Sequence, residues 1–267
     1  MGVFENCVVI VTGASEGIGR ALCVALAARR ARLVLAARNE ERLLSLAGDC
    51  SAAGSETLVH RTDVTSAESC RCLVEATVSR FGTIDVLVNN AGGTMWTPFE
   101  QVEDLTIFDR LMQLNYLGSV YPTYFALPHL RRSRGRLVAV ASVAGLVGVP
   151  TRTAYSAAKH AVVGFFDSLR VELDGSGVSV TVICPDFVLS EIHRRALGGD
   201  GRPLGRSPLQ EAKIMTAERC AELMIDAMAA RRRILITSRR GRFGRWLSVV
   251  APSLIDRVAA KAIRDGR

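Results

Sequence analysis

The sequence predicts an α/β fold: one domain whose doubly wound, mostly parallel sheet of seven strands carries helices on both faces. Short β-branched runs alternate with amphipathic segments along most of the chain. The first run, residues 7–11, enters a glycine-rich turn that leads into a helical pattern, and 267 residues are an ordinary length for one α/β domain. We therefore expect one domain over residues 1–238 and a C-terminal extension over residues 239–267.

The composition argues against a membrane-spanning protein, a metal site and a disulfide-linked secreted protein. Apolar residues make up 49% of the chain, yet no uncharged apolar run reaches the ~18 residues that predict a membrane span. The seven cysteines contain no C-x-x-C pair and the four histidines lack ligand spacing, so we expect buried thiols in a reducing, cytoplasmic compartment and no metal site. The N-terminal apolar run has no basic segment before it, so we interpret it as a core strand rather than a signal peptide.

The positive charge is concentrated at the C-terminus. Residues 231–267 hold eleven Lys/Arg and two Asp, whereas the rest of the chain is close to neutral. Within residues 246–263, apolar positions at helical spacing lie opposite charged ones, which predicts a basic amphipathic helix. This helix could contact a membrane surface peripherally, or pack on its own subunit or a partner, and the pattern leaves both open. Nucleic acid is not expected, because no base-reading motif accompanies the arginines.

The remaining elements follow from periodicity. After the first strand, we expect strands at 32–37, 57–60, 85–88, 137–141, 178–184 and 234–237. Helices are expected to follow the glycine turn and the second strand, and at 67–81, about 154–173 and about 217–230. A long helix is also expected over 104–131, bent near Pro122 and ending around Pro128.

A glycine-rich turn follows the first strand. Gly13, Gly17 and Gly19 have the spacing G-x-x-x-G-x-G. A strand, turn and helix in this order present backbone N–H groups and the positive end of a helix to a pyrophosphate. Gly13 permits the tight turn, and the other two glycines let a dinucleotide and the helix approach closely. The alternative is a glycine-rich turn that binds nothing.

The end of the second strand indicates which dinucleotide binds. Arg38 lies where an acid would hold a ribose 2′-hydroxyl, whereas an arginine accommodates a 2′-phosphate. With Ser15 as a hydroxyl donor, Arg38 favours NADP(H) over NAD(H). Glu40 and Glu41 are expected in the first turn of the next helix. Asp63 either accepts from an adenine amino group or caps the helix that follows it.

Tyr155 and Lys159 form a candidate acid/base pair. In a helix they would lie on one face, one turn apart. Because a fixed positive charge favours the phenolate, we predict that Lys159 lowers the pKa of Tyr155 toward neutrality and makes it a general acid/base. Ser142 follows strand 137–141, and so belongs at the carboxyl edge of the sheet, where ligands bind. The alternative is a chance spacing in an ordinary helix.

Two loops are expected to surround this pair. Met95, Trp96 and Phe99 follow the fourth strand and either contact substrate or belong to the core. A polar, glycine-rich stretch follows the sixth strand, and we expect a substrate lid over residues 186–215.

The ordered set of motifs resembles the short-chain dehydrogenase/reductases over about residues 7–238. The resemblance rests on Thr12 to Gly19, Asp63-Val64, Asn89 to Gly92, Asn115, Ser142, and Tyr155 with Lys159. It implies a Rossmann fold and an NADP(H)-dependent oxidoreductase that moves a hydride between nicotinamide C4 and a carbonyl or secondary alcohol. The C-terminal part is similar to the branch of 11-beta-hydroxysteroid dehydrogenases and lipid-handling reductases, which implies a lipophilic small-molecule substrate. The resemblance to the family as a whole implies a homodimer or homotetramer.

The resemblance also implies roles for single residues. Tyr155 would exchange the proton with the substrate oxygen and Ser142 would hydrogen-bond that oxygen. Lys159 would bind the nicotinamide ribose and Asn115 would hold a relay water. The implied cofactor contacts are Gly13, Ser15, Gly17, Ile18, Gly19, Arg38, Asp63, Val64, Asn90, Ala91, Gly92, Tyr155, Lys159, Pro185, Val188 and Ser190. The expected substrate contacts are Met95, Trp96, Phe187 and Ile192.

One departure from the family pattern affects the lid. The family commonly has Pro-Gly and a later Thr, where this chain has Pro185-Asp186 and Ser190. A carboxylate at position 186 is expected to alter the local charge or the hinge of the lid. Together with the basic tail, it leaves an alternative function open: a regulator that senses NADP(H) without turnover.

Overall fold

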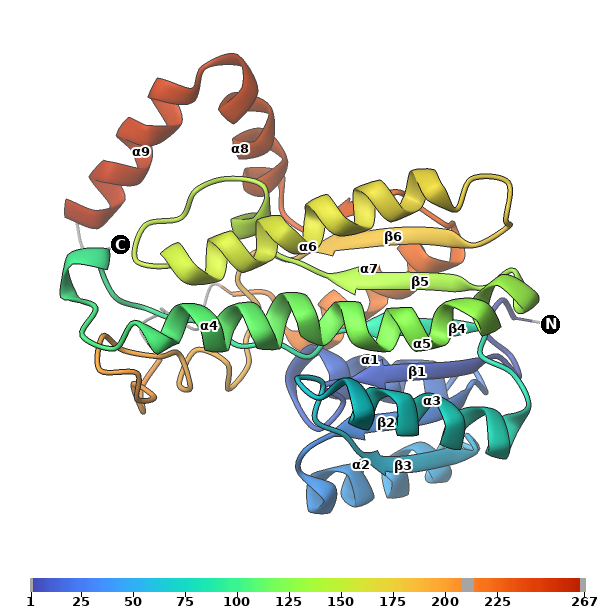
Figure 1. The fold of residues 1–267 in the computed structure, drawn as a ribbon. Coiled ribbons are helices and arrows are strands. Elements are labelled where there is room, and N and C mark those ends of the chain that lie inside the picture. The colour runs from blue at the N-terminus through green and yellow to red at the C-terminus, as the bar shows by residue number, and fades with distance from the viewer. Residues whose placement is uncertain (1, 208–213, 265–267) are drawn as a thin grey trace.

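The computed structural model describes residues 2–207 and 214–264, and its centre is a seven-stranded parallel sheet (Figure 1). The strand order β3-β2-β1-β4-β5-β6-β7 reverses direction between β1 and β4, which places a binding crevice at the carboxyl ends of these two strands. The predicted α/β class and the seven strands are confirmed. The strands are β1 (Val8–Thr12), β2 (Arg32–Ala37), β3 (Thr57–Arg61), β4 (Val86–Asn89), β5 (Arg136–Val140), β6 (Ser179–Cys184) and β7 (Ile234–Ile236).

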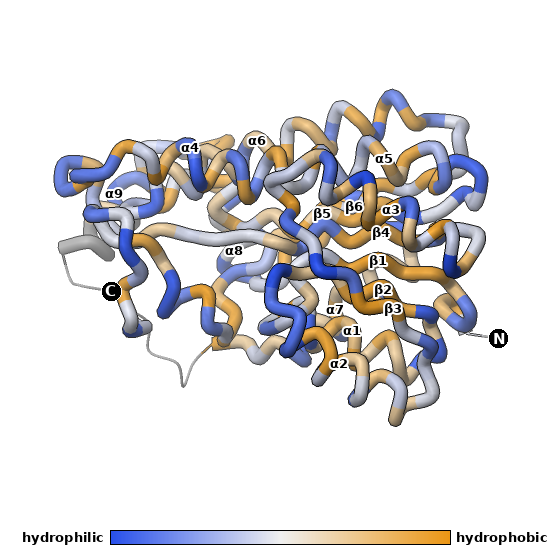
Figure 2. The backbone as a smooth tube through the Cα atoms, turned by 60° about the horizontal axis from the view of Figure 1, so that its bottom comes forward, coloured by the Kyte–Doolittle hydropathy of each residue, from blue (hydrophilic) through white to orange (hydrophobic). Residues whose placement is uncertain are grey.

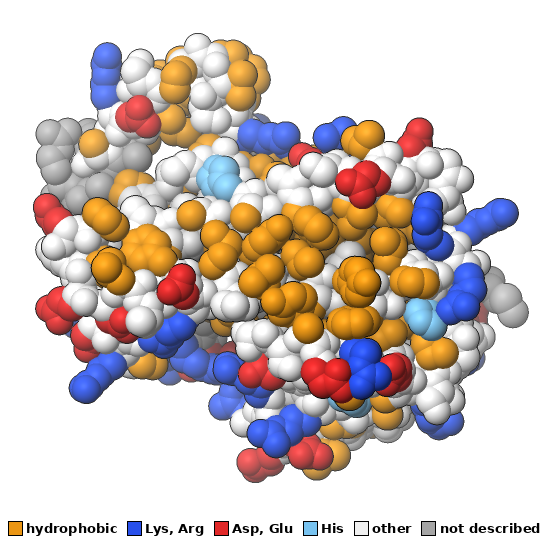
Figure 3. All heavy atoms as spheres, viewed as in Figure 1, with side chains coloured by type: hydrophobic (Ala, Val, Ile, Leu, Met, Phe, Trp, Pro, Cys, Tyr) orange, Lys and Arg blue, Asp and Glu red, His pale blue; other side chains and the backbone are white. Residues whose placement is uncertain are grey.

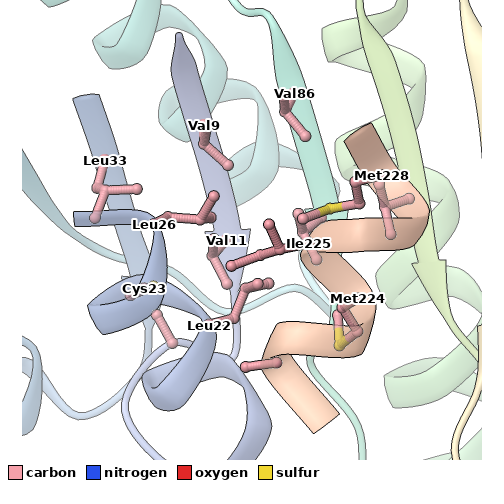
Figure 4. Close-up of a cluster of buried hydrophobic side chains, with 14 of the residues drawn as sticks. Val9, Val11, Leu22, Cys23, Leu26, Leu33, Val86, Met224, Ile225 and Met228 are labelled. Atoms are coloured by element: carbon pink, nitrogen blue, oxygen red, sulfur yellow. The ribbon is translucent and has the colours of Figure 1, made fainter. Parts of the chain in front are cut away.

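Helices cover both faces of the sheet. One face carries α1 (Gly17–Ala27), α2 (Glu40–Ala52) and α7 (Ala217–Ala229), and the other carries α3 (Ala67–Phe81), α5 (Gly118–Ser133) and α6 (Thr153–Glu172). Figure 4 shows apolar side chains of α1 and α7 meeting over β1, β2 and β4. Because both faces are covered, central strands such as β1 and β2 are buried, nearly continuous apolar runs, and in Figure 2 the hydrophobic colour runs along them.

The predicted long helix is interrupted elsewhere than expected. α4 (Thr106–Met112) passes through a π-helical turn (Gln113–Leu117) into α5. The predicted end near Pro128 is wrong, since α5 runs through both prolines to Ser133, whereas the bend near Pro122 stays a prediction. Buried residues of α5 such as Ala126 and Leu130 pack on the sheet, and this packing keeps the helix continuous past its two prolines. The irregular turn contains Asn115, and π-helical turns of this kind are frequent at functional sites.

The C-terminal extension forms two helices rather than the single one expected within residues 246–263. α8 (Arg239–Val250) and α9 (Pro252–Arg264) are separated at Ala251, because proline is tolerated at the first position of a helix but not in its interior. In Figure 1 the pair stands above the carboxyl ends of the strands. α8 packs on its own chain, since a Cβ on Gly241 would lie 2.7 Å from Cγ2 of Val143.

Two further observations bear on the composition. All seven cysteines are free, and five of them are buried, as expected. None of the helices in the described part of the chain has the length and apolar character needed to cross a membrane.

Candidate active site

A cavity of about 680 Å³ opens at the carboxyl edge of the sheet. Every predicted catalytic and cofactor residue except Gly19 lines it, although these residues come from segments spread between positions 13 and 190. Of the four expected substrate contacts, Phe187 and Ile192 line the cavity, whereas Met95 and Trp96 do not.

The glycine turn provides bare backbone along one wall. Gly13 has a φ of +65°, and a Cβ there would lie 2.8 Å from Cα of Ala91. A Cβ on Gly19 would lie 2.3 Å from the carbonyl oxygen of Gly13, so Gly19 lets α1 pack against the turn without itself reaching the cavity. α1 begins at Gly17, and its N-cap residue Glu16 makes no capping hydrogen bond. These features suit a pyrophosphate, which N–H groups at a helix N-terminus can bind.

Asn90 fixes this wall to the next strand. Its Nδ2 donates to the carbonyl oxygens of Thr12 at 3.0 Å and Gly13 at 3.2 Å. The Thr12 hydroxyl accepts from the backbone N–H groups of Asn90 and Ala91 at 3.0 and 3.1 Å. The ends of β1 and β4 are therefore joined where the strand order reverses, and the shape of the crevice is set by the chain itself.

Two arginines lie at the far end of this wall. Arg38 follows β2, and Arg42 lies in the first turns of α2; both are exposed and line the cavity. Arg42 was missed by the sequence reasoning, although it follows Arg38 at a spacing of four residues. It pairs with Glu16 at 2.7 Å, and Arg195 pairs with the same carboxylate, so this acid joins the glycine turn to the lid segment.

Asp63 accepts from the backbone N–H and the hydroxyl of Thr65 at 3.0 and 2.8 Å. Ser66, not Asp63, caps α3, so the capping alternative is wrong. Burial raises the pKa of Asp63, but its hydrogen bonds to Thr65 and the charge of Arg38 outweigh burial, and the pKa lies below the ordinary value. Asp63 therefore presents a carboxylate to the cavity.

The Ser142, Tyr155 and Lys159 side chains meet at the opposite end. α6 places Nζ of Lys159 5.8 Å from the centre of the Tyr155 ring, and the Ser142 hydroxyl, which accepts from the N–H of Ala144 at 3.1 Å, acts on the Tyr155 phenol. Nζ of Lys159 donates to the carbonyl oxygen of Val140 at 2.8 Å. Burial lowers the pKa of Lys159 to about 8.

The pKa of Tyr155 differs from the prediction. Burial raises it above the ordinary value, and the hydrogen bond with Ser142 and the charge of Arg152 offset this only in part. The predicted net shift of the Tyr155 pKa toward neutrality is therefore wrong, because burial of the phenolate costs more than its neighbours recover. At neutral pH the phenol is protonated.

Asn115 secures the loop beneath this cluster. Its Nδ2 donates to the carbonyl oxygens of Gly93 at 3.1 Å and Leu111 at 2.9 Å, and its Oδ1 accepts from the N–H of Gly93 at 3.3 Å. Its Oδ1 would lie 2.7 Å from a Cβ on Gly92. The π-helical turn thus places Asn115 against the loop that follows β4.

The expected substrate residues in the 95–99 loop have other surroundings. Met95 is fully buried in a small core cluster with Ile107 and Leu111. Phe99 is exposed and packs edge-on against Phe108. Long apolar side chains in this loop therefore stabilise the loop rather than form the cavity wall.

Asp186 connects the end of β6 to the start of α8. Its carboxylate accepts from the hydroxyl of Ser238 at 2.8 Å and from Nη2 of Arg240 at 3.0 Å. Its backbone N–H donates to the hydroxyl of Thr237 at 3.1 Å. The departure at position 186 thus fixes α8, whose Phe243 and Leu247 line the cavity. The sequence reasoning did not find these two residues, because they reach the site only through tertiary packing.

A parallel sheet with a glycine-rich turn at its point of reversal, and a Ser, Tyr and Lys cluster beside it, is the arrangement expected of a nicotinamide-dependent oxidoreductase. The family model described as short chain dehydrogenase matches residues 7–198. The chain belongs to the short-chain dehydrogenase/reductase family, whose members act on hydroxyl and carbonyl groups.

Known proteins agree with this assignment. The chain is 37% identical over 265 residues to the 11-beta-hydroxysteroid dehydrogenase of Pinus massoniana, with 94% of this chain and 72% of the pine protein covered. It is 35% identical over 259 residues to the dehydrogenase/reductase SDR family protein 7-like of Dictyostelium discoideum, with 95% of this chain and 80% of that protein covered. The resemblance to the 11-beta-hydroxysteroid dehydrogenase branch is thus confirmed.

Solved structures share the fold. A short chain dehydrogenase/reductase from Burkholderia phymatum in complex with NAD matches at a TM-score of 0.84 and 27% identity, covering 95% of this chain and 96% of that one. An alcohol dehydrogenase from the archaeon Thermococcus sibiricus complexed with 5-hydroxy-NADP matches at a TM-score of 0.74 and 26% identity, covering 86% and 95%. Both structures contain a nicotinamide dinucleotide: NAD in the first and an NADP derivative in the second.

Proposed function

We propose that this protein is an NADP(H)-dependent oxidoreductase that interconverts a carbonyl and a secondary alcohol in a lipophilic small molecule, with Tyr155 as the general acid/base. The single observation that carries the proposal is the meeting of Tyr155, Ser142 and Lys159 at the end of a cavity whose other end is bare glycine backbone. The bound nicotinamide would supply or accept the hydride.

The chain's own residues would manage the proton. A buried phenol with a raised pKa is protonated at neutral pH, so Tyr155 is ready to give its proton to a carbonyl oxygen. The Ser142 hydroxyl would hydrogen-bond the same oxygen and stabilise the charge that develops on it. The ammonium of Lys159, held by the Val140 carbonyl, would favour the phenolate that remains.

The preference for NADP(H) is supported by charge. Arg38 and Arg42 both line the cavity beyond the glycine turn, and no acid occupies the end of β2. Two guanidinium groups suit a 2′-phosphate, because arginine donates in a fork that matches phosphate oxygens. Asp63 and Val64 would contact the adenine, and Pro185, Val188 and Ser190 the nicotinamide end.

A lipophilic substrate is supported by the walls around Tyr155. Val147, Val149, Phe187, Phe243 and Leu247 all face the cavity. Residues 186–215 would act as the lid; positions 208–213 of this range lie outside the described residues. Within the rest, Leu197 exchanges backbone hydrogen bonds with Thr94 and Trp96 at 3.0 and 2.9 Å, which docks the lid segment on the loop after β4.

An apolar surface supports self-association. Figure 3 shows hydrophobic side chains gathered over α5 and α6, and a shallow depression there is lined by Met112, Tyr116, Leu117, Ala161 and Phe165. A homodimer or homotetramer would cover this face. Sedimentation of the chain should give a dimer or larger species, and Phe165→Glu should shift it toward the monomer.

The outer side of the α8–α9 pair supports peripheral membrane contact. Trp246, Val249 and Val250 are exposed, and arginines 239, 242 and 245 lie on the same helix. Co-sedimentation with liposomes containing phosphatidylserine should be lost when residues 239–267 are removed and at high salt. Equal sedimentation of both chains would reject this contact.

The proposed activity is tested by NADPH oxidation with a panel of aryl and aliphatic ketones. We expect turnover with NADPH and much slower turnover with NADH. Tyr155→Phe should lower kcat by about 10³-fold while NADPH still binds, because only the proton donor is removed. Unchanged turnover in that variant would reject Tyr155 as the acid, and NADPH binding without reduction of any carbonyl would favour a sensor.

A further inference from the structure

Arg152 lies in the wall of the cavity, three residues before Tyr155. Its side chain is buried between aromatic rings, and the residue is only 5% exposed. The guanidinium carbon lies 4.2 Å from the ring centre of Trp96 and 5.1 Å from that of Phe187. The two rings, whose centres lie 6.4 Å apart, thus hold the guanidinium in place through cation–π contacts.

The charge of Arg152 is not neutralised by the described chain. Its Nε and Nη2 are shielded from water and have no hydrogen-bond partner among the described residues. The carboxylate of Asp186 acts on Arg152 electrostatically, but its own hydrogen bonds are made with Ser238 and Arg240. Burial lowers the pKa of Arg152, yet a guanidinium stays protonated in proteins. A buried cation without a hydrogen-bonded counter-charge is costly, so an anion bound beside it would offset that cost.

The two unpaired nitrogens indicate which anion fits. The Nε–H and Nη2–H bonds leave the same edge of the guanidinium side by side, at the spacing of the two oxygens of a carboxylate. Because Nε and Nη2 are shielded from water in the unliganded chain, a carboxylate has to displace the atoms that cover this edge. In the plane of the guanidinium it would then accept both hydrogen bonds, with Trp96 and Phe187 covering the faces. The guanidinium carbon lies 5.9 Å from the centre of the Tyr155 ring, so this anion would sit a few bonds from the reacting carbonyl.

The position of Arg152 argues against a phosphate of the dinucleotide. The groups suited to phosphate, namely the glycine turn, Arg38 and Arg42, line the other end of the cavity. Arg152 instead shares its end with Tyr155, Phe187 and the apolar side chains of α8.

We propose that Arg152 determines substrate specificity by binding a carboxylate of the substrate through Nε and Nη2 while the substrate carbonyl lies at Tyr155. The substrates would then be lipophilic oxo acids and the corresponding hydroxy acids rather than neutral ketones. This inference rests on the proposed function, because it concerns the substrate of the same site.

The test compares aryl oxo acids with their uncharged esters: benzoylformate, benzoylpropionate and benzoylbutyrate, each beside its methyl ester. For at least one chain length, the wild-type protein should reduce the acid with a kcat/KM about tenfold or more above that of the ester. Arg152→Gln should lower kcat/KM for that acid by about 100-fold, mainly through KM, and for the ester by less than about threefold. Arg152→Lys keeps the charge but not the forked pair of donors, so its kcat/KM for the acid should lie between those of the wild-type protein and Arg152→Gln.

Arg240 offers a matched control. Its guanidinium also stacks on Phe187, with 5.6 Å between the guanidinium carbon and the ring centre, but it is exposed and paired with Asp186. Arg240→Gln removes a charge from the same neighbourhood and loosens the contact that starts α8, so KM should rise for acid and ester alike and the acid-to-ester ratio should stay unchanged. Equal losses on acid and ester in Arg152→Gln, or a wild-type ratio near one for every pair, would overturn the proposal, because Arg152 would then act on Tyr155 or on packing alone.

A binding measurement separates this inference from the proposed function. In Tyr155→Phe loaded with NADP⁺, calorimetry should show that the acids bind more tightly than the esters, and that the added Arg152→Gln change removes the difference. Preferential binding of acids without reduction by the wild-type protein would overturn the proposed function and leave the carboxylate receptor standing. Reduction of the carbonyls without preferential binding of the acids would overturn the carboxylate receptor and leave the proposed function standing.

Discussion

The two ends of the cavity are built from different parts of the chain. The end proposed for the dinucleotide, called the dinucleotide end below, consists mostly of backbone from one continuous segment, the turn between β1 and α1, joined to β4 by Asn90. The substrate end consists of side chains that arrive from the start of α6, the segment after β6, and α8. The first end is therefore specified locally by glycine spacing, whereas the second depends on long-range packing and is where specificity can change without disturbing the fold.

Gly19→Ala should give the largest effect, because it breaks the backbone end. An added Cβ would lie 2.3 Å from the Gly13 carbonyl oxygen and 2.6 Å from Nδ2 of Asn90, so backbone has to move. We expect a loss of roughly 3 kcal/mol in the free energy of unfolding and NADPH binding weakened by about 100-fold. Urea unfolding and calorimetry measure the two effects.

Gly48→Ala is the control for that change. Gly48 lies within α2, and a Cβ there would meet nothing within 4 Å. Alanine should stabilise the helix by up to about 1 kcal/mol and leave NADPH binding unchanged. If both glycine variants behaved alike, the close packing of the turn would not be what shapes the dinucleotide end.

Arg38→Glu should separate the two cofactors. Replacing a 2′-phosphate donor by a carboxylate should weaken NADPH by about 100-fold and change NADH by less than about threefold. Fluorescence titration with each dinucleotide measures this, and Arg131→Glu, an exposed site on α5, makes the same charge change far from the cavity. Equal weakening of both dinucleotides would argue against a 2′-phosphate contact.

Lys159→Met should change how stability depends on pH. The folded pKa of Lys159, about 8, lies below its ordinary value of 10.5, so the unfolded chain binds more protons between these values. The Lys159 contribution to stability is therefore unfavourable at pH 7 and improves as pH rises. Between pH 7 and 9 the stability of the wild-type protein should rise by roughly 1 kcal/mol relative to the variant. Parallel pH profiles from urea unfolding of the two proteins would contradict this.

Asp186→Asn should change stability least of these variants, and it should affect the substrate end of the cavity but not the dinucleotide end. It weakens the contact with Arg240, an exposed side chain, so the free energy of unfolding should fall by no more than about 1 kcal/mol. Because α8 starts at this contact, KM for the carbonyl substrate should rise severalfold while NADPH affinity stays constant. A change confined to NADPH affinity would assign Asp186 to the dinucleotide end instead.

The same contrast explains which features could be predicted from the sequence. The strands, the glycine turn and the Tyr155–Lys159 pair depend on short-range patterns, and these predictions match the structure. The π-helical turn could not be predicted, since the contacts that Asn115 makes there with Gly93 join segments 22 residues apart. The aromatic pocket of Arg152 depends on rings 56 and 35 residues away in the chain. The raised pKa of Tyr155 depends on burial, which spacing along a helix does not reveal.

Hydride transfer to a carbonyl carbon, assisted by the Tyr155 proton, is the central claim, and isotope transfer tests it most directly. NADPH carrying deuterium at the transferable position of nicotinamide C4 is incubated with the aryl oxo acids and their methyl esters, and the products are analysed by mass spectrometry. The account predicts one deuterium on the carbinol carbon with the wild-type protein, and product formation slowed by about 10³-fold in Tyr155→Phe. Product without deuterium, or labelled product formed equally fast by the variant, would contradict it.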